Sequence, residues 1–156
     1  MKKTRVKLNS EGLFAMLVPM LEDNLDVLIP VSGNSMYPLW KHNRDSVVVT
    51  SCNPYALKKG DIPLYRRASG QVVMHRIIRV NQDGYDMCGD IETQIEYNLP
   101  KDNIIAVVKC FTRKGQDYSC THFGYKMYSF LWIRLRPLRR FFLKGYREWM
   151  KRMPAE

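Results

Sequence analysis

The chain has 156 residues, of which 46% are hydrophobic, and its formal net charge is +10. This length supports one core with terminal additions rather than two independent domains, and the apolar fraction excludes wholesale disorder. The positive charge indicates an anionic partner such as a membrane surface or a nucleic acid.

The cysteines and the apolar stretches of the sequence argue against a zinc-binding or disulfide-rich protein and against a signal peptide or a membrane-spanning helix. The four cysteines are widely spread and form no Cys-x-x-Cys pair, so we expect neither a zinc site nor a dense disulfide framework, and we interpret them as reduced. The apolar run at 13–21 is short, contains Pro19 and lacks a following cleavage site, so it does not predict a signal peptide. No uncharged apolar stretch reaches the roughly 18 residues of a spanning helix. We therefore expect a cytoplasmic or peripherally membrane-associated protein.

The chain begins with a predicted helix and continues as short strands. Ser10 as N-cap and leucines at helical spacing predict an amphipathic helix over 10–25, with Pro19 expected to kink or weaken it. Asp83-Gly84 gives the strongest hairpin signal. Short β-branched and apolar runs between turn residues predict strands at 27–31, 46–50, 62–66, 72–80, 85–88 and 104–111. Strands this short and frequent favour a mainly β body, a small barrel or sandwich.

The composition becomes basic and aromatic towards the C-terminus, so we expect a main domain over 1–120 and a helical tail over 121–156. Residues 123–156 contain nine basic and two acidic residues, a net charge of +7. Two interpretations stay open. The tail lies in a lipid interface, attracted to anionic head groups, or it packs its aromatic stripe on the body and exposes a basic face. No motif that reads nucleic acid is recognised, so a nucleic acid is not the expected partner.

The candidate nucleophile lies in the turn after the 27–31 strand. Ser35 is presented by Ser-Gly-Asn-Ser-Met-Tyr-Pro at 32–38. Gly33 permits a backbone conformation that a side chain would forbid, and Pro38 biases the preceding residue away from the helical region. A serine held in such a turn suits a nucleophile only when a base lies within reach.

His75, 40 residues after Ser35, is the candidate base. On a continuous 72–80 strand it would share an apolar face with its second neighbours. That pattern is also typical of a half-buried histidine with a satisfied hydrogen bond. As a base it would take the serine proton, because imidazole titrates near neutral pH. Asp90 is the candidate acid that would orient the base, although a Gly-Asp pair also commonly ends a hairpin.

The order of these segments resembles that of a known family. The matching segments are the serine turn at 32–38, Lys-Gly-Asp-Ile at 59–62, the His75-Arg76 strand, and Gly89-Asp90 followed by Ile-Ala-Val-Val at 105–108. Together they resemble, in the same order, the sequence boxes of the signal peptidase I and LexA-type serine peptidases. A histidine base in place of the lysine is similar to the archaeal and endoplasmic-reticulum signal peptidases. The resemblance covers roughly residues 26–110.

The resemblance implies a mostly β, partly open barrel and a serine endopeptidase that needs no cofactor or metal. Ser35 would be the nucleophile, His75 the base and Asp90 the acid partner, with backbone N–H groups near the serine as oxyanion donors. The segment after Asp90 departs from the family pattern, so Glu92, Glu96 or water are alternatives for the acid.

The implied substrate is a peptide or preprotein that loses a signal or leader segment. Two other classes remain open: a peptidase-fold binding module with little activity at a membrane surface, and a self-cleaving regulator.

Overall fold

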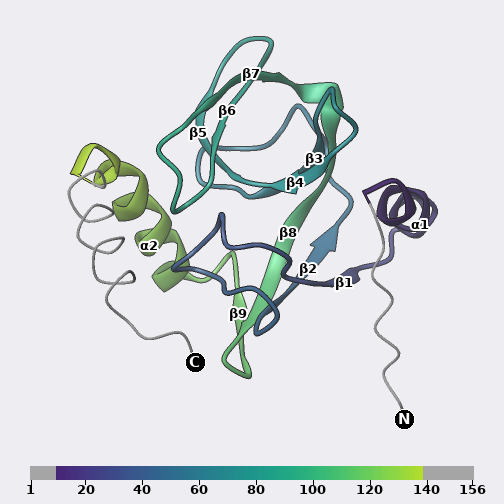
Figure 1. Cartoon of the computed structure of the whole chain (residues 1–156), viewed down its shortest axis with the longest axis horizontal. Helices are drawn as coiled ribbons and strands as arrows, with labels where there is room; N and C mark the ends of the chain where they lie inside the picture. Colours follow the sequence, from purple (N-terminus) through teal and green to yellow (C-terminus); the bar gives the residue numbers. More distant parts are fainter. Residues whose placement is uncertain (1–9, 139–156) are drawn as a thin grey trace, which may run out of the picture.

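The computed structural model describes residues 10–138, a mainly β chain with a helix towards each end (Figure 1). Helices α1 and α2 lie on opposite sides of the strands (Figure 1). In chain order the elements are α1 (Ser10–Glu22), β1 (Val27–Pro30), β2 (Ser46–Thr50), β3 (Pro63–Arg66), β4 (Val72–Met74), β5 (Arg76–Val80), β6 (Gly84–Cys88), β7 (Glu96–Pro100), η1 (Lys101–Asn103), β8 (Ile104–Arg113), β9 (Gln116–Ser119), α2 (Phe123–Arg134) and η2 (Arg136–Leu138).

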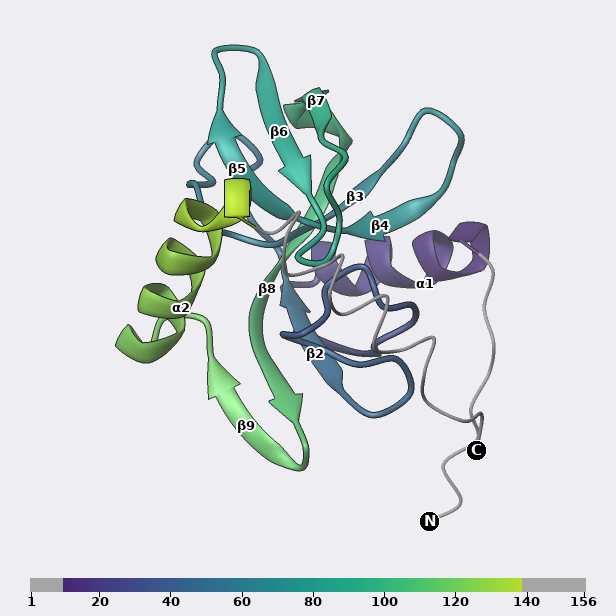
Figure 2. The same ribbon diagram turned by 60° about the vertical axis from the view of Figure 1, so that its left-hand side comes forward.

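The strands form two antiparallel sheets. The larger has the order β1-β2-β8-β3-β4, with β9 paired to β8, and the smaller has the order β5-β6-β7. Irregular register at Val48/Val49 and at Leu64/Tyr65 adds local twist, and the large sheet curls into a half-barrel. Figure 2 shows β8 running along the molecule with β2 beside it and β9 at its end. The predicted fold class, a mainly β, partly open small barrel with a short N-terminal helix and a C-terminal helix, is confirmed.

The predicted continuous strand over 72–80 is wrong. β4 belongs to the large sheet and β5 to the small one, and the chain passes from one sheet to the other at His75. His75 therefore lies at a corner rather than on one face of a strand. The residues on either side of His75 include β-branched residues that favour strands, and no glycine or proline separates them. The local sequence therefore does not predict that the strand is interrupted at His75.

Two strands and one helix end also differ from the prediction. β7 and β9 were not predicted, because their residues include Asn98 and Pro100 and the polar run at 116–119, which are depleted in strands. α1 ends at Glu22 rather than at residue 25, and Asn24 follows it with a φ of 57°.

Two apolar clusters form the interior. Buried α1 side chains Leu17 and Leu21 belong to the larger cluster, which the large sheet completes, and within it Trp40 meets Phe111 edge to face at 5.7 Å. The smaller cluster comprises Tyr65, Ile77, Tyr85, Met87, Leu99 and Ile104. Leu64 and Tyr65 are adjacent on β3 and belong to different clusters, so β3 lies between the two cores.

Residues 10–138 bear on the state of the cysteines and on the expectation that no helix spans a membrane. The four cysteines all lie within residues 10–138, and the structure joins none of them in a disulfide. In the same range, no helix combines the length and apolar character needed to cross a membrane.

Phe111 tests the packing of the larger cluster. It is 4% exposed and contacts the rings of Trp40, Tyr118 and Tyr125. We expect Phe111→Ala to lower the free energy of unfolding by about 3–5 kcal/mol, measured by urea denaturation, because the lost contacts leave a cavity. The matched control is Phe123→Ala: this ring is 73% exposed, and its loss should change stability by less than about 0.5 kcal/mol. Equal effects of the two substitutions would contradict the packing.

Candidate functional site

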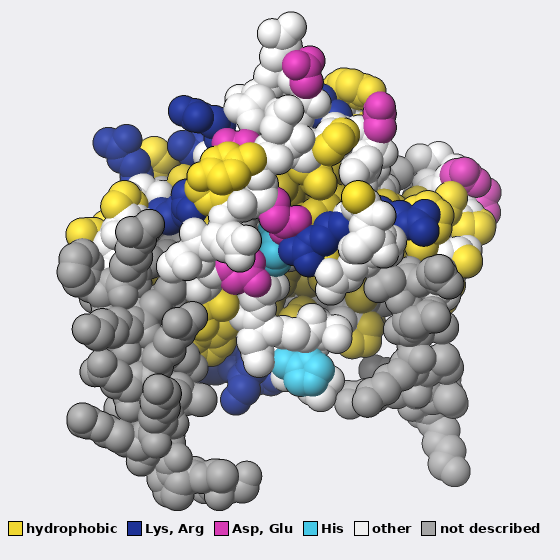
Figure 3. All heavy atoms as spheres, turned by 45° about the horizontal axis from the view of Figure 1, so that its top comes forward, with side chains coloured by type: hydrophobic (Ala, Val, Ile, Leu, Met, Phe, Trp, Pro, Cys, Tyr) yellow, Lys and Arg dark blue, Asp and Glu magenta, His cyan; other side chains and the backbone are white. Residues whose placement is uncertain are grey.

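One cavity of about 300 Å³ brings the predicted nucleophile and base together. Ser35 reaches it from the turn after β1, and His75 reaches it from the corner between the two sheets. Most of the other lining side chains are apolar, and Glu92 and Arg67 add charge. On one face of the molecule, acidic and basic side chains gather around a histidine ring (Figure 3). The structure therefore places a half-buried serine and a buried imidazole on the same cavity.

His42 holds the serine turn from one side. Gly33, with a φ of +89°, donates its backbone N–H to His42 Nδ1 at 3.0 Å. The backbone N–H of His42 in turn donates to Asn34 Oδ1 at 3.1 Å. These two bonds hold Gly33 and Asn34, which directly precede Ser35, against His42. The positive φ explains why glycine suits position 33.

The loop after β6 holds the serine turn from the other side. The Ile91 N–H donates to the Ser35 carbonyl oxygen at 3.0 Å. A Cβ on Gly89 would lie 2.7 Å from that same oxygen, so the two backbones approach too closely for a side chain at position 89. The serine is thus fixed by its own backbone against the 89–91 loop.

A carboxylate contacts the imidazole, and it belongs to Glu96 of β7. His75 Nδ1 lies 2.9 Å from Glu96 Oε1 and 3.0 Å from the Tyr65 hydroxyl. Tyr65 donates its O–H to Glu96 Oε1 at 2.6 Å, and Arg67 donates to both carboxylate oxygens at 2.6 and 2.8 Å. Burial alone would raise the pKa of Glu96, but the hydrogen bonds from Arg67 and Tyr65 outweigh it and lower the pKa to about 2. Glu96 is therefore ionised at neutral pH.

An ionised Glu96 determines which ring nitrogen of His75 carries the proton. A carboxylate accepts hydrogen bonds only, so Nδ1 is the protonated nitrogen and donates to Glu96. Nε2 of the neutral ring then carries the lone pair that a general base needs. Nε2 lies 3.6 Å from Oε2 of Glu92, a residue that lines the same cavity as Ser35.

Asp90, the predicted acid partner of His75, is bound elsewhere. Both of its oxygens accept from Arg76, at 2.8 and 2.7 Å, and both side chains are about 1% exposed. The remaining Arg76 donors go to the Gly60 carbonyl oxygen and to hydroxyls of α2, from Tyr125 and Ser129. The assignment of Asp90 to the imidazole is therefore corrected: Glu96, one of the alternatives, occupies that place.

Three residues around the site, Tyr65, Arg67 and His42, were not singled out from the sequence. Tyr65 and Arg67 are two positions apart, a spacing that puts side chains on one face of an extended segment, and this could have been a signal. Glu96 was named only as an alternative acid, because it lies on a strand that was not predicted and no local pattern relates it to His75. His42 has no signal either, because its bonds are to the backbone and amide of the turn.

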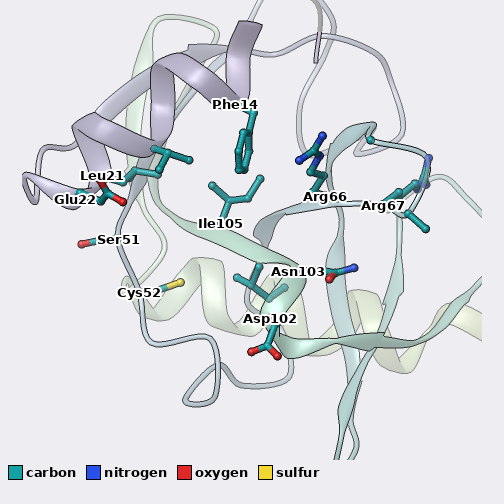
Figure 4. A pocket seen from close by; sticks show the side chains of 14 residues that line it. Phe14, Leu21, Glu22, Ser51, Cys52, Arg66, Arg67, Asp102, Asn103 and Ile105 are labelled. Atoms are coloured by element: carbon teal, nitrogen blue, oxygen red, sulfur yellow. The ribbon is translucent and has the colours of Figure 1, made fainter. Parts of the chain in front are cut away.

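A second cavity, of about 650 Å³, lies beside α1 (Figure 4). Phe14 and Leu21 of α1 line one side of it, and Arg66 stacks over the Phe14 ring at 4.9 Å. Its thiol, Cys52, is a poor nucleophile, because burial raises its pKa to about 11 and keeps it protonated. The lining residues among 10–138 include no histidine that would serve as a base. Arg67 lines both cavities.

Comparison with protein-family models, with curated proteins and with solved structures finds no match for this chain. The assignment of function therefore depends on the residues of the smaller cavity and their geometry.

The position of Asp90 predicts a structural role. We expect Asp90→Ala to lower the free energy of unfolding by about 3–5 kcal/mol, because it leaves the Arg76 charge buried without its carboxylate. The double variant Arg76→Met/Asp90→Leu should recover most of that loss, since it removes both charges. Urea denaturation measures both effects, and an Asp90→Ala protein as stable as wild type would contradict the role.

The low pKa of Glu96 predicts a pH-dependent contribution to stability. Because the pKa falls from about 4.5 to about 2 on folding, the contribution is complete above about pH 4.5 and is lost as the pH falls towards 2. We therefore expect the difference in unfolding free energy between wild type and Glu96→Gln to shrink over this range, measured by denaturation at a series of pH values. A difference that is the same at both ends of the range would contradict the ionised network.

Proposed function

We propose that this protein is a serine endopeptidase in which Ser35 is the nucleophile, His75 the general base and Glu96 the residue that orients the base. The observation that supports this most is the 2.9 Å contact between His75 Nδ1 and Glu96, on a cavity that Ser35 shares. That contact leaves Nε2 as the proton acceptor, which is one of the requirements for activating a serine.

The reaction follows from these positions. His75 Nε2 takes the Ser35 hydroxyl proton as Oγ attacks the carbonyl carbon of the substrate, and the resulting imidazolium is stabilised by ionised Glu96. The imidazolium then protonates the leaving amine as the C–N bond breaks, which yields an acyl-enzyme and a free amine. Water, deprotonated by His75, hydrolyses the ester and restores the serine. Among the described residues, no hydrogen bond engages the Ser35 backbone N–H, which makes it the candidate oxyanion donor.

An extended peptide fits the surroundings of the cavity. β1 and β4 are the two ends of the large-sheet order, and they lead directly into the serine turn and into His75. Residues 29–31 and 72–74 line the cavity together. Strands at a sheet end offer backbone hydrogen bonds to an added peptide, and apolar side chains along them accept apolar residues.

The motif order favours a signal or leader segment as the part removed. The serine turn, the His75-Arg76 pair and the Gly89-Asp90 pair follow one another as in the histidine-type signal peptidases. We propose that the substrate is a peptide or preprotein whose leader lies extended along β1 and β4.

A second candidate is a binding module that holds an extended peptide without cleaving it. The observation that favours it is the Glu92 carboxylate, 3.6 Å from His75 Nε2, where it competes with Ser35 for the base. The two candidates differ in serine reactivity.

A fluorophosphonate probe measures this difference. We expect wild type to be labelled at Ser35, Ser35→Ala to remain unlabelled, and His75→Ala to be labelled at least about 10²-fold more slowly, because it lacks the general base. The matched controls are Ser51→Ala and His122→Ala, which change a serine and a histidine outside the smaller cavity and should react as wild type does. A wild-type protein that resists the probe would contradict the peptidase and favour the binding module.

A further inference from the structure

Helix α2 has an inner face that is bound to the site. Tyr125 and Ser129 accept hydrogen bonds from Arg76 at 3.1 and 2.7 Å. One turn further, Trp132 donates its indole N–H to the Asp90 carbonyl oxygen at 3.2 Å. These residues recur at helical spacing, so one side of the helix is bonded to Arg76 and to the loop that holds the serine turn.

The opposite face of α2 and of η2 is apolar, basic and exposed. Phe123 is 73% exposed and Phe130 60%, and the other apolar side chains of this face are 43–49% exposed. The exposed apolar residues of this face are Phe123, Met127, Phe130, Leu131, Leu135 and Leu138. Lys126 and Arg134 lie among them, and residues 123–138 include no acidic residue. We call this set of residues the outer face of α2.

The outer face combines apolar and positively charged side chains, and this combination favours one kind of partner over the others. A contiguous exposed apolar patch marks an interaction surface. A second copy of the chain would bring one positive face against another, since residues 123–138 contain three basic residues and no acidic one. A nucleic acid would match the charge but would leave the phenylalanine and leucine side chains in water. An anionic lipid surface accepts both, because the apolar side chains enter the acyl boundary while lysine and arginine meet the head groups.

We propose that the outer face of α2 is the docking surface for an anionic lipid bilayer. Docking would place the loop around Asp90, which the inner face of α2 contacts, about one helix diameter of 10 Å from the membrane. The inference goes beyond the proposed peptidase chemistry and is independent of it.

Vesicle co-sedimentation of the full chain tests the docking surface. We expect binding to vesicles of phosphatidylcholine mixed with phosphatidylglycerol, weakened by salt, and little binding to phosphatidylcholine alone. Phe130→Glu/Leu131→Glu should weaken binding at least tenfold, and Lys126→Gln or Arg134→Gln should each weaken it about fivefold. The matched control is Val80→Glu on β5, a residue that is 46% exposed and lies outside the outer face, and it should bind as wild type does.

The possible results separate the alternatives. Ser35→Ala should bind vesicles as wild type does, so a failure of the peptidase proposal does not affect this measurement. Full chain that does not bind the anionic vesicles would overturn the inference. Binding that Phe130→Glu/Leu131→Glu leaves unchanged would overturn it too. Circular dichroism shows whether each variant is folded. If the double variant does not fold, the vesicle binding of Lys126→Gln and Arg134→Gln tests the inference instead.

Discussion

The buried ion pair between Arg76 and Asp90 is the interaction on which the rest of the site depends. Arg76 is buried, so its charge requires a carboxylate and further acceptors. These lie on three separate segments. Asp90 fixes the loop whose next residue, Ile91, binds the Ser35 carbonyl, and Ser129 fixes α2. A guanidinium suits this place because its planar, fixed donors can serve several acceptors at once.

Adjacent residues 75 and 76 therefore take different carboxylates. His75 lies at the corner between the two sheets and Arg76 is the first residue of β5, and the two side chains contact carboxylates of different segments. Arg76 takes Asp90, and His75 takes Glu96 from β7, which Arg67 and Tyr65 keep ionised. One carboxylate thus supports the architecture while the other orients a proposed base, and each is held by its own arginine.

The same ion pair relates the proposed chemistry to the proposed membrane surface. α2 is joined to the site through Arg76 and through the Asp90 carbonyl, so its outer face has a defined position relative to the serine turn. For residues 121–138, the part of the C-terminal segment that the structure describes, the two interpretations are for this reason not exclusive. The face with Tyr125, Tyr128 and Trp132 packs on the body, as an ordinary helix does, while a second apolar face stays exposed.

What the sequence determined by itself is local. Periodicity and turn residues predicted α1, most of the strands and the helix after residue 121, and the serine turn and His75 stood out by residue type. Only the tertiary structure decided that the chain changes sheets at His75, and that Glu96 rather than Asp90 contacts its ring. The physical reason is range: a turn or a helix is specified by neighbours a few residues apart. The partner of the buried His75 imidazole depends instead on the pairing of β6 with β7, which brings Glu96 to the ring, and on the ion pair of Asp90 with Arg76.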